Sequence, residues 1–308
     1  MEQIYDTVII GGGPAGYASA LYTARAGLST LVVEGMTPGG QMTLTDIIDN
    51  YPGFDEGVDG FTLATKMQQG AERFGAVTMY SPVLSCDLTG KIKTLETYEG
   101  TVQAKTVIIA TGASPRELGL PCEAKYLGRG VHYCAHCDGR FYKDKSVIVV
   151  GGGNSAASDA LYLSHLCKKV TVVHRRDSLR ATKIYHEPLM KADNIEFIWN
   201  SEIVDLVADG KISGIVVQNK ESGEQTTVPC DGLFVSIGRV PATAFLGGQV
   251  ETDPNGYIVA GEDTKTSLDG VFAPGDVRTK VLRQVVTAVS DGAVAAHYAE
   301  EYISQLAN

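Results

Sequence analysis

The sequence contains no apolar run of the roughly 20 residues that a helix needs to cross a bilayer. Residues 1–6 lack the basic region that begins a secretory signal peptide. Positive charge is not in excess either, since 36 acidic residues against 26 Lys and Arg give a formal net charge of −10. Such a charge repels nucleic acid and anionic membranes. These absences predict a soluble cytoplasmic protein that binds neither.

A disulfide framework is also missing, because six cysteines are few for a cytoplasmic chain of 308 residues. Cys134 and Cys137 form the one pair at a redox-type Cys-x-x-Cys spacing. The other four are scattered, and we predict small packing residues at Cys86, Cys122, Cys167 and Cys230.

Two glycine-rich segments each follow an apolar run and precede helix-compatible residues. The first spans residues 11–16 and the second spans residues 151–156. This order of strand, glycine turn and helix is typical of dinucleotide-binding folds, in which phosphate binds at the helix N-terminus. A chain of this length holds about two domains, so we expect one domain for each glycine segment.

In each copy, the residue that ends the strand after the glycine segment and its helix predicts which dinucleotide binds. Glu34 offers a carboxylate to a free ribose 2′-hydroxyl, which suits FAD or NAD. In the second copy, His174, Arg175 and Arg176, with Arg180 beyond them, suit the 2′-phosphate of NADP. The alternatives are an exposed carboxylate at a strand end and a solvated basic face.

The two units that begin with these glycine segments also end in a similar way. Residues 107–115 and residues 233–241 each contain an expected hydrophobic strand, followed by a glycine and a proline. We infer an internal duplication. The chain then ends in an expected helix over about residues 283–303, with an apolar stripe at Val285, Val286, Val289, Ala293 and Ala296. If this helix docks on the first unit, the second unit is an insertion, and its two crossings form a hinge near residues 112–115 and 238–241.

Two further segments, residues 39–43 and residues 50–54, are rich in turn-forming residues. They read equally well as loops over a ligand and as surface turns.

With these features in order, the chain resembles the low-molecular-weight bacterial-type thioredoxin reductases over its whole length. The resemblance implies two Rossmann-like α/β domains, with the second inserted into the first. An FAD-binding domain would comprise residues 1–114 and 242–308, and an NADPH-binding domain with the dithiol would comprise residues 115–241. It also implies a homodimer whose partner is thioredoxin or a thioredoxin-like protein disulfide.

The family pattern also assigns residues to each cofactor. At FAD it places Gly11, Gly13, Pro14, Ala15, Gly16, Glu34, Gly40, Gln41, Asn50, Ala110, Thr111, Gly112, Gly275, Asp276, Arg283, Gln284 and Val285. At NADPH it places Gly151, Gly153, Asn154, Ser155, Ala156, His174, Arg175, Arg176, Arg180, Ile237 and Gly238.

Our hypothesis for the chemistry passes electrons from NADPH to FAD, to the Cys134–Cys137 disulfide and then to an external disulfide. Asp138 would serve as general acid, with an N-cap as its alternative role. The spacer residue His136 departs from the commonest pattern, and an imidazolium there would favour thiolate at Cys137. Because the dithiol and the NADPH segment share one unit, we expect that unit to rotate between two positions.

Two other functions fit parts of the pattern. One is an NADPH-dependent flavoprotein that reduces the thiol protein of a peroxide-reducing system, although such relatives usually carry an additional N-terminal thiol domain. The other is a zinc site at His132, Cys134, His136 and Cys137. Four ligands within six residues are crowded for one tetrahedral ion, so we expect no metal, and we expect His132 to be a packed or hydrogen-bonded side chain.

Overall fold

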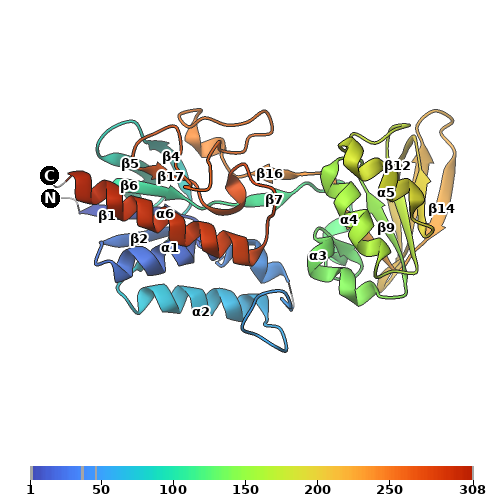
Figure 1. The fold of residues 1–308 in the computed structure, drawn as a ribbon, viewed down its shortest axis with the longest axis horizontal. Helices are drawn as coiled ribbons and strands as arrows, with labels where there is room; N and C mark the ends of the chain where they lie inside the picture. Colours follow the sequence, from blue (N-terminus) through green and yellow to red (C-terminus); the bar gives the residue numbers. More distant parts are fainter. Residues whose placement is uncertain (1–2, 36–37, 46, 307–308) are drawn as a thin grey trace. The chain divides into compact units, whose positions relative to one another are not determined.

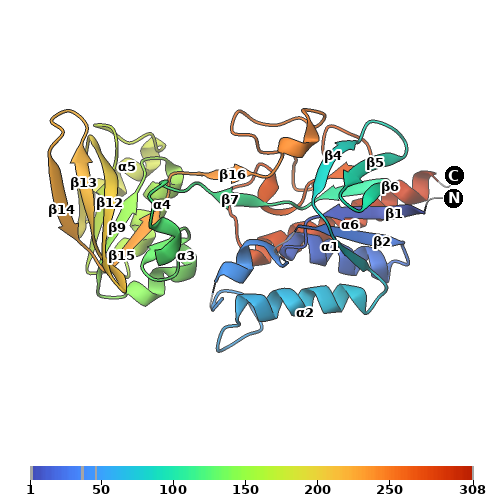
Figure 2. The ribbon, with the colours of Figure 1, turned by 180° about the vertical axis from the view of Figure 1, so that it is seen from behind.

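The computed structural model describes residues 3–35, 38–45 and 47–306. The chain divides into two compact units, which Figures 1 and 2 show from opposite sides. Unit 1 comprises Met1–Ser114 and Val240–Asn308, and unit 2 comprises Pro115–Arg239. The predicted fold class, two Rossmann-like domains with the second inserted into the first, is confirmed.

Unit 1 is built on a seven-stranded sheet in the order β3-β2-β1-β6-β5-β4, with β17 also paired to β6. The strands from β3 to β6 are parallel, and β5 and β4 extend the sheet in antiparallel fashion. Its elements are β1 (Ile4–Ile10), α1 (Pro14–Arg25), β2 (Thr30–Glu34), η1 (Gly40–Leu44), α2 (Gly60–Glu72), β3 (Val77–Tyr80), β4 (Val83–Asp87), β5 (Lys93–Thr97), β6 (Gly100–Ile109), η5 (Ala244–Leu246), β17 (Val271–Phe272), η6 (Gly275–Val277) and α6 (Val285–Leu306).

Both faces of this sheet are buried, because successive side chains of a strand point to opposite sides. On β1, Ile9 joins a cluster with residues of α1 and α6. Val8 and Ile10 join a second cluster with β5 and the segment that follows β16 (Arg239–Pro241). Figure 1 shows α6 lying along α1, with α2 on the far side of α1.

The stripe predicted for the last helix is wrong in its detail. Ala296 is buried as predicted, but Val286 is 41% exposed, and helix α6 also buries Ala288, Gly292, Ala295 and Ala299. The reason is the closeness of α1, since a Cβ at Gly292 would overlap the backbone carbonyl of Ala15. Small residues therefore form this contact, and larger valines would hold the two helices apart.

Unit 2 has a parallel sheet in the order β11-β10-β9-β15-β8 and a separate antiparallel sheet, β12-β13-β14. Hydrophobic residues of the antiparallel sheet cover one face of the parallel sheet, and α4 covers the other. The elements are η2 (Glu123–Tyr126), β8 (Val131–His132), α3 (Ala135–Asp138), η3 (Gly139–Tyr142), β9 (Ser146–Val150), α4 (Asn154–Ser164), β10 (Lys169–Val173), η4 (Lys183–Tyr185), α5 (His186–Lys191), β11 (Ile195–Ile198), β12 (Ser201–Asp209), β13 (Lys211–Asn219), β14 (Gln225–Pro229) and β15 (Gly232–Val235).

The two units repeat one order of elements. The series β1-α1-β2-α2-β3 has its counterpart in β9-α4-β10-α5-β11, and a three-stranded antiparallel stretch follows each. This repetition supports the inferred duplication. The chain crosses between the units at β7 (Ala113–Pro115) and β16 (Arg239–Pro241), which pair as a two-stranded sheet.

None of the helices within the described ranges combines the length and the hydrophobicity that a membrane span requires.

Candidate active site

The first glycine segment has the geometry that a bound pyrophosphate requires. Gly11 has φ +104°, and a Cβ at Gly16 would overlap the carbonyl oxygen of Gly11, so both positions exclude a side chain. Gly13 is the N-cap of α1 and has no side-chain cap, and a Cβ there would meet nothing within 4 Å. Backbone amides at this helix end therefore face open space, where a phosphate can bind.

Glu34 lies directly against this segment. Its carboxylate is only 2% exposed and accepts hydrogen bonds from the Tyr17 hydroxyl at 2.7 Å and from the Gly39 amide at 2.6 Å. Burial raises the pKa of Glu34 although both donors oppose the shift. A Cβ at Gly12 would overlap the carboxylate, so Gly12 admits it to the turn. The alternative of an exposed strand-end carboxylate is wrong.

Three other segments of unit 1 converge on the same helix end. Gly40 in η1 approaches Gly13, because a Cβ at Gly40 would lie 3.3 Å from the Gly13 Cα. Gly275 in η6 approaches α1, since its Cβ would lie 2.9 Å from the Ala15 Cβ. Ala110, after β6, contacts Gly11 through its carbonyl. The structure thus brings together residues that are more than 200 positions apart in the sequence.

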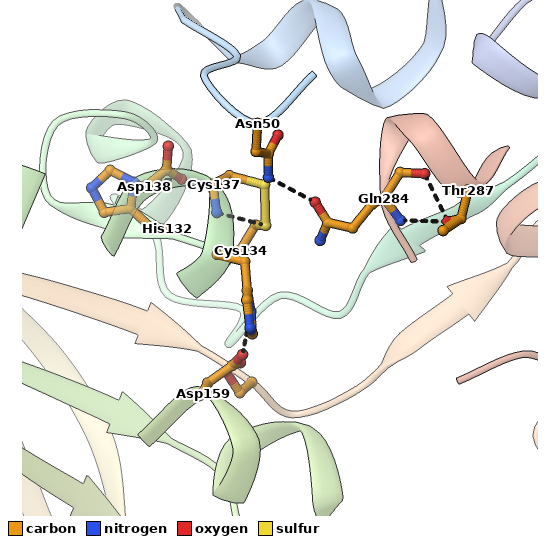
Figure 3. The surroundings of a disulfide bond; sticks show 10 residues. Asn50, His132, Cys134, Cys137, Asp138, Asp159, Gln284 and Thr287 are labelled. Carbon is orange, nitrogen blue, oxygen red and sulfur yellow. Dashed lines mark hydrogen bonds and ion pairs between the residues drawn. A yellow bond between two sulfur atoms is a disulfide. The ribbon is translucent and has the colours of Figure 1, made fainter. Parts of the chain in front are cut away.

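Asn50 and Gln284, both expected at the flavin, meet through a hydrogen bond from Asn50 Nδ2 to Gln284 Oε1 at 2.9 Å (Figure 3). Figure 3 also shows the Gln284 amide donating to the Thr287 hydroxyl in the first turn of α6. Gln284 therefore links the start of α6 to the segment around Asn50.

The remaining predicted FAD residues of unit 1 lie on these same segments. The Thr111 hydroxyl donates to the Ala242 carbonyl at 2.8 Å. The Arg283 guanidinium instead donates to the backbone carbonyls of Lys280 and Arg278 and lies over the Tyr257 ring. The others occupy the first turn of α1, the η1 and η6 helices, the connection between β6 and β7 and the start of α6: Pro14, Ala15, Gln41, Gly112, Asp276 and Val285.

A buried charge cluster that the sequence analysis missed holds the Gly275 turn. Asp291 of α6 accepts hydrogen bonds from the Gly275 amide, from two nitrogens of Arg278 and from Lys280, at 2.8–3.0 Å. Burial alone would raise the pKa of Asp291, but these donors lower it below its ordinary value. An acidic residue in an otherwise apolar helix stripe is the signal that could have identified it.

The second glycine segment repeats the geometry of the first. Gly151 has φ +146°, and a Cβ at Gly153, the uncapped N-cap of α4, would meet nothing within 4 Å. His174 takes the place that Glu34 has in unit 1, because a Cβ at Gly152 would overlap its imidazole ring. Burial and then the nearby arginines lower the pKa of His174, so the ring is neutral at pH 7. Its Nε2 is buried and has no hydrogen-bond partner among the residues that the structure describes.

The three predicted arginines lie on an exposed loop that folds back onto the glycine segment. The amides of Arg180 and Ala181 both donate to the Gly152 carbonyl, at 2.7 and 3.0 Å. The amide of Thr182 donates to the Asn154 side chain at 2.8 Å. Their exposed guanidinium groups are thus tethered beside the helix end, at Arg175, Arg176 and Arg180.

The other residues expected at NADPH have differing surroundings. Ala156 is fully buried against Gly151, and Ser155 is exposed in the first turn of α4. Ile237 packs partly buried against the hydrophobic cluster between the two sheets. Gly238 follows it with φ +107°.

Cys134 and Cys137 form a disulfide with an S–S distance of 2.11 Å (Figure 3). Cys134 is the N-cap of the four-residue helix α3, and its sulfur accepts a hydrogen bond from the Cys137 amide. Asp138 ends this helix and occupies the N-cap position of the following turn, η3, but its side chain makes no cap bond there. Its Oδ2 lies 3.0 Å from His132 Nδ1 instead.

The two histidines beside the dithiol point to different partners. His132 is buried and also contacts the Tyr142 hydroxyl through Nε2 at 2.7 Å, as expected for a hydrogen-bonded side chain. His136 stacks on Tyr162 of α4, with Nδ1 3.8 Å from Asp159. Burial raises the pKa of Asp159 against the opposing bond from Ser236. Whether His136 favours thiolate at Cys137 stays a prediction.

These contacts bear on the zinc alternative. Both sulfurs are joined to each other, and both imidazoles have carboxylate partners. Within the part of the chain that the structure describes, no group of three or more His, Cys, Asp or Glu side chains has the geometry of a metal site.

The scattered cysteines divide into two kinds. Burial raises the pKa of Cys86 and of Cys167 to about 11, and that of Cys230 to about 12, so these thiols remain protonated. They fit the predicted packing role. Cys122 is exposed, so that role is wrong for it.

Comparison with known proteins now decides the family. A profile described as pyridine nucleotide-disulphide oxidoreductase matches residues 5–292. A curated thioredoxin reductase of Listeria monocytogenes is 47% identical over 99% of this chain and 96% of its own length. The protein belongs to the pyridine nucleotide-disulphide oxidoreductase family.

Solved structures agree with this assignment. Thioredoxin reductase from Streptococcus pyogenes superposes with a TM-score of 0.91 at 43% identity, covering 99% of this chain and all of that one. Thioredoxin reductase from Lactococcus lactis, in the FR conformation, gives a TM-score of 0.68 at 42% identity, covering 98% and 99%. Membership in this oxidoreductase family implies the use of a flavin and a pyridine nucleotide.

Proposed function

We propose that this oxidoreductase passes electrons from NADPH through FAD and the Cys134–Cys137 disulfide to the disulfide of thioredoxin or a thioredoxin-like protein. The observation that carries the proposal is the placement of the dithiol. Unit 2 holds both the dithiol and the glycine segment flanked by arginines, while unit 1 holds the segment closed by a carboxylate. Relatives named thioredoxin reductase support the choice of client.

FAD fits unit 1, and we assign this unit as its binding domain. The open helix end at Gly13 suits a pyrophosphate, and Glu34 retains lone pairs for a ribose hydroxyl beyond its two donors. When bound, FAD accepts a hydride and releases the two electrons to a disulfide. The start of α6, which follows Gln284, supplies backbone amides and a positive helix end that stabilise negative charge.

NADPH fits unit 2, and we assign this unit as its binding domain. The helix end at Gly153 accepts the pyrophosphate, and the arginine loop tethered to Gly152 supplies guanidinium groups for the 2′-phosphate. The unpartnered Nε2 of His174 lies at the same strand end and is an additional polar group for the nucleotide.

Replacing Arg175 and Arg176 together with glutamine should raise the KM for NADPH by about 100-fold and leave the KM for NADH nearly unchanged. Two lost charge-assisted hydrogen bonds at about 1.5–3 kcal/mol each account for at least this effect. Steady-state kinetics with both nucleotides measure it. Arg129→Gln, at an exposed arginine elsewhere in unit 2, is the matched control. Equal losses for both nucleotides would contradict the phosphate assignment.

The dithiol reduces its client by two exchanges. One thiolate of the reduced pair attacks a client sulfur, so a mixed disulfide forms while the client S–S bond breaks. The departing sulfur leaves with the electron pair and takes a proton from Asp138. The second cysteine gives its proton to the Asp138 carboxylate and attacks the mixed disulfide, which re-forms the Cys134–Cys137 bond. The second client sulfur leaves with its electron pair and takes that proton from Asp138.

Anaerobic titration with NADPH tests the whole proposal. The yellow absorbance should bleach while thiols appear, and two thiols per chain should be released before excess NADPH accumulates. Addition of oxidised thioredoxin should then restore the disulfide. Bleaching without release of thiols would reject the dithiol step, and faster oxidation by a peroxide-reducing thiol protein would favour that client instead.

We also propose that unit 2 changes position during turnover. Only the short paired strands β7 and β16 carry the chain between the units. Unit 2 holds both the dithiol and the arginine-flanked glycine segment, and a change of position would bring each of them to the same flavin in turn.

A non-reducible cross-link that fixes the two units in one relative position should lower steady-state turnover by roughly tenfold or more, since domain motion gates many turnover rates. The linker would join one introduced cysteine in each unit, in a Cys122→Ser background that removes the exposed native thiol. The same variant without the linker is the control. Undiminished turnover after cross-linking would reject the motion.

A homodimer and a cytoplasmic location complete the proposal. The family resemblance in the sequence implies the homodimer, and sedimentation of the purified protein tests it directly.

A further inference from the structure

We propose that His132 positions the carboxyl group of Asp138, so that one carboxyl oxygen is held in the protein while the other serves the dithiol. The arrangement is a row of contacts that runs from the Tyr142 hydroxyl through the His132 ring to the Asp138 carboxyl group. The inference rests on the proposed dithiol function and adds a residue that acts through the general acid. Figure 3 shows His132 beside Asp138 in the surroundings of the disulfide.

Distances define the arrangement. Asp138 Oδ2 lies 3.0 Å from His132 Nδ1, and His132 Nε2 lies 2.7 Å from the Tyr142 hydroxyl. The imidazole is 6% exposed and stacks on Phe234 of β15, with ring centroids 5.3 Å apart. Tyr142 contacts the same two rings edge-on. His132 is therefore fixed by its ring contacts and at both its nitrogens.

The surroundings also fix the direction of the hydrogen bonds. Burial, and then the negative charge of Asp138, raise the pKa of Tyr142 to about 12, so its hydroxyl keeps its proton. An ionised Asp138 only accepts hydrogen bonds, so Nδ1 carries the imidazole proton and donates it to Oδ2. Nε2 is then an acceptor, and the Tyr142 hydroxyl is its donor.

Other titratable groups that face this arrangement are few. Cys230 and Asp231 act on Tyr142, and Lys145 lies 5.3 Å from the centre of its ring. Burial raises the pKa of Cys230 to about 12, so this thiol is neutral. Phe234, the stacking partner of His132, carries no charge. His132 therefore acts on Asp138 through the Nδ1 bond.

The arrangement has a chemical purpose. A general acid transfers its proton efficiently only when the reacting oxygen is held within hydrogen-bonding reach of its partner. Asp138 directly follows Cys137 on a four-residue helix, and such a short helix gives a carboxyl group little support of its own. The bond from Nδ1 holds Oδ2 and stabilises the carboxylate that remains after the proton leaves, while Oδ1 stays available to a sulfur.

His132→Phe should lower kcat for thioredoxin reduction by about tenfold, a part of the 10²–10⁴-fold that general acid catalysis contributes. Phenylalanine keeps the ring stack on Phe234 but has no donor. His132→Asn should recover most of the rate, because its amide nitrogen can donate from the position of Nδ1. Tyr142→Phe should have a smaller effect in the same direction. His165→Phe, at an exposed histidine after α4, is the control.

Two readouts separate positioning from a general structural role. The pH profile of kcat should differ from that of the wild type in His132→Phe and match it in His132→Asn, because only phenylalanine lacks a donor to the carboxyl group. In an Asp138→Asn background, His132→Phe should cause no further loss of kcat. Reduction of the flavin by NADPH precedes the dithiol exchange and should be the same in all of these variants.

The outcomes distinguish the inference from the proposed function. A wild-type enzyme that fails to reduce thioredoxin would reject the function itself. If the wild type is active, an unchanged kcat in His132→Phe overturns the inference. So does an equal loss from His132→Phe in the wild-type and Asp138→Asn backgrounds, since a residue that acts through a carboxyl has no effect once that carboxyl is removed. If His132→Phe does not fold, His132→Asn provides the test. A folded His132→Asn protein that has lost the rate would overturn the inference.

Discussion

Cys134→Ser protein reduces thioredoxin at a rate roughly a thousandfold or more below that of the wild type, because removing a covalent nucleophile eliminates the step it performs. The expected loss is equally large for Cys137→Ser, since the pair can neither accept two electrons as a disulfide nor resolve a mixed disulfide. Steady-state turnover with NADPH and oxidised thioredoxin measures the effect. The buried thiols of Cys86, Cys167 and Cys230 cannot substitute, because they keep their protons.

Cys122→Ser is the matched control, because Cys122 is the exposed free thiol and lies outside the α3 helix. We expect it to keep the wild-type rate. Rapid mixing with NADPH should still bleach the flavin in both active-site variants, which separates loss of the dithiol from loss of the fold. Wild-type turnover in either serine variant would refute the electron path.

Asp291→Asn should destabilise unit 1 by about 3–5 kcal/mol, the usual effect of removing one partner from a buried ion pair. The carboxylate of Asp291 faces Arg278 and Lys280, whose side chains are 3% and 7% exposed. Asparagine leaves two buried cations without their anion. The backbone amide of Gly275 donates a hydrogen bond to the same carboxylate. We therefore also expect the variant to bind the flavin less tightly.

The chain offers a separate probe for each unit. Its single tryptophan, Trp199, lies in unit 2, so tryptophan fluorescence reports that unit during urea unfolding. Flavin release reports unit 1. In Asp291→Asn the flavin transition should move to lower urea while the Trp199 transition stays in place. Glu262→Gln is the control, because Glu262 lies 3.8 Å from Arg278 but is 98% exposed, and exposed pairs contribute little.

The pH dependence of this effect has a definite sign. In the folded protein the pKa of Asp291 is below the ordinary value of about 3.9 that the unfolded chain has. The unfolded state therefore binds more protons between the two values, so stability rises with pH through that window. The contribution is complete above about pH 4–5 and is lost as the pH falls through the folded value. Asp291→Asn should flatten this part of the acid-unfolding curve, and an unchanged curve would show that the carboxylate contributes nothing.

The glycine segments made much of the fold predictable. A strand, a glycine turn and a helix must be adjacent in sequence, so the positions of β1 and β9 and of the helices after them follow from local pattern. The disulfide spacing and the roles expected for Glu34 and His174 are local in the same way. What the sequence concealed is contact between distant segments.

Helix α6 shows why. We predicted an apolar stripe of three valines and two alanines. The close approach to α1 instead selects alanine and glycine at the contact. This preference depends on a partner about 270 residues away in the chain. The ion cluster at Asp291 and the hydrogen bond between Asn50 and Gln284 likewise join residues that no spacing relates. The bond between His132 and Asp138 spans only six residues, but it depends on a turn whose direction local propensity does not determine.

Gly12 and Gly152 each leave room for the side chain that ends the second strand of their unit, a carboxylate in one case and an imidazole in the other. One backbone therefore accommodates either group without rearrangement. The two units thus keep the same turn at this corner while they present different side chains to it. Redesign of coenzyme choice in this enzyme can proceed by the same route, by exchanging side chains at the corner while leaving the scaffold untouched.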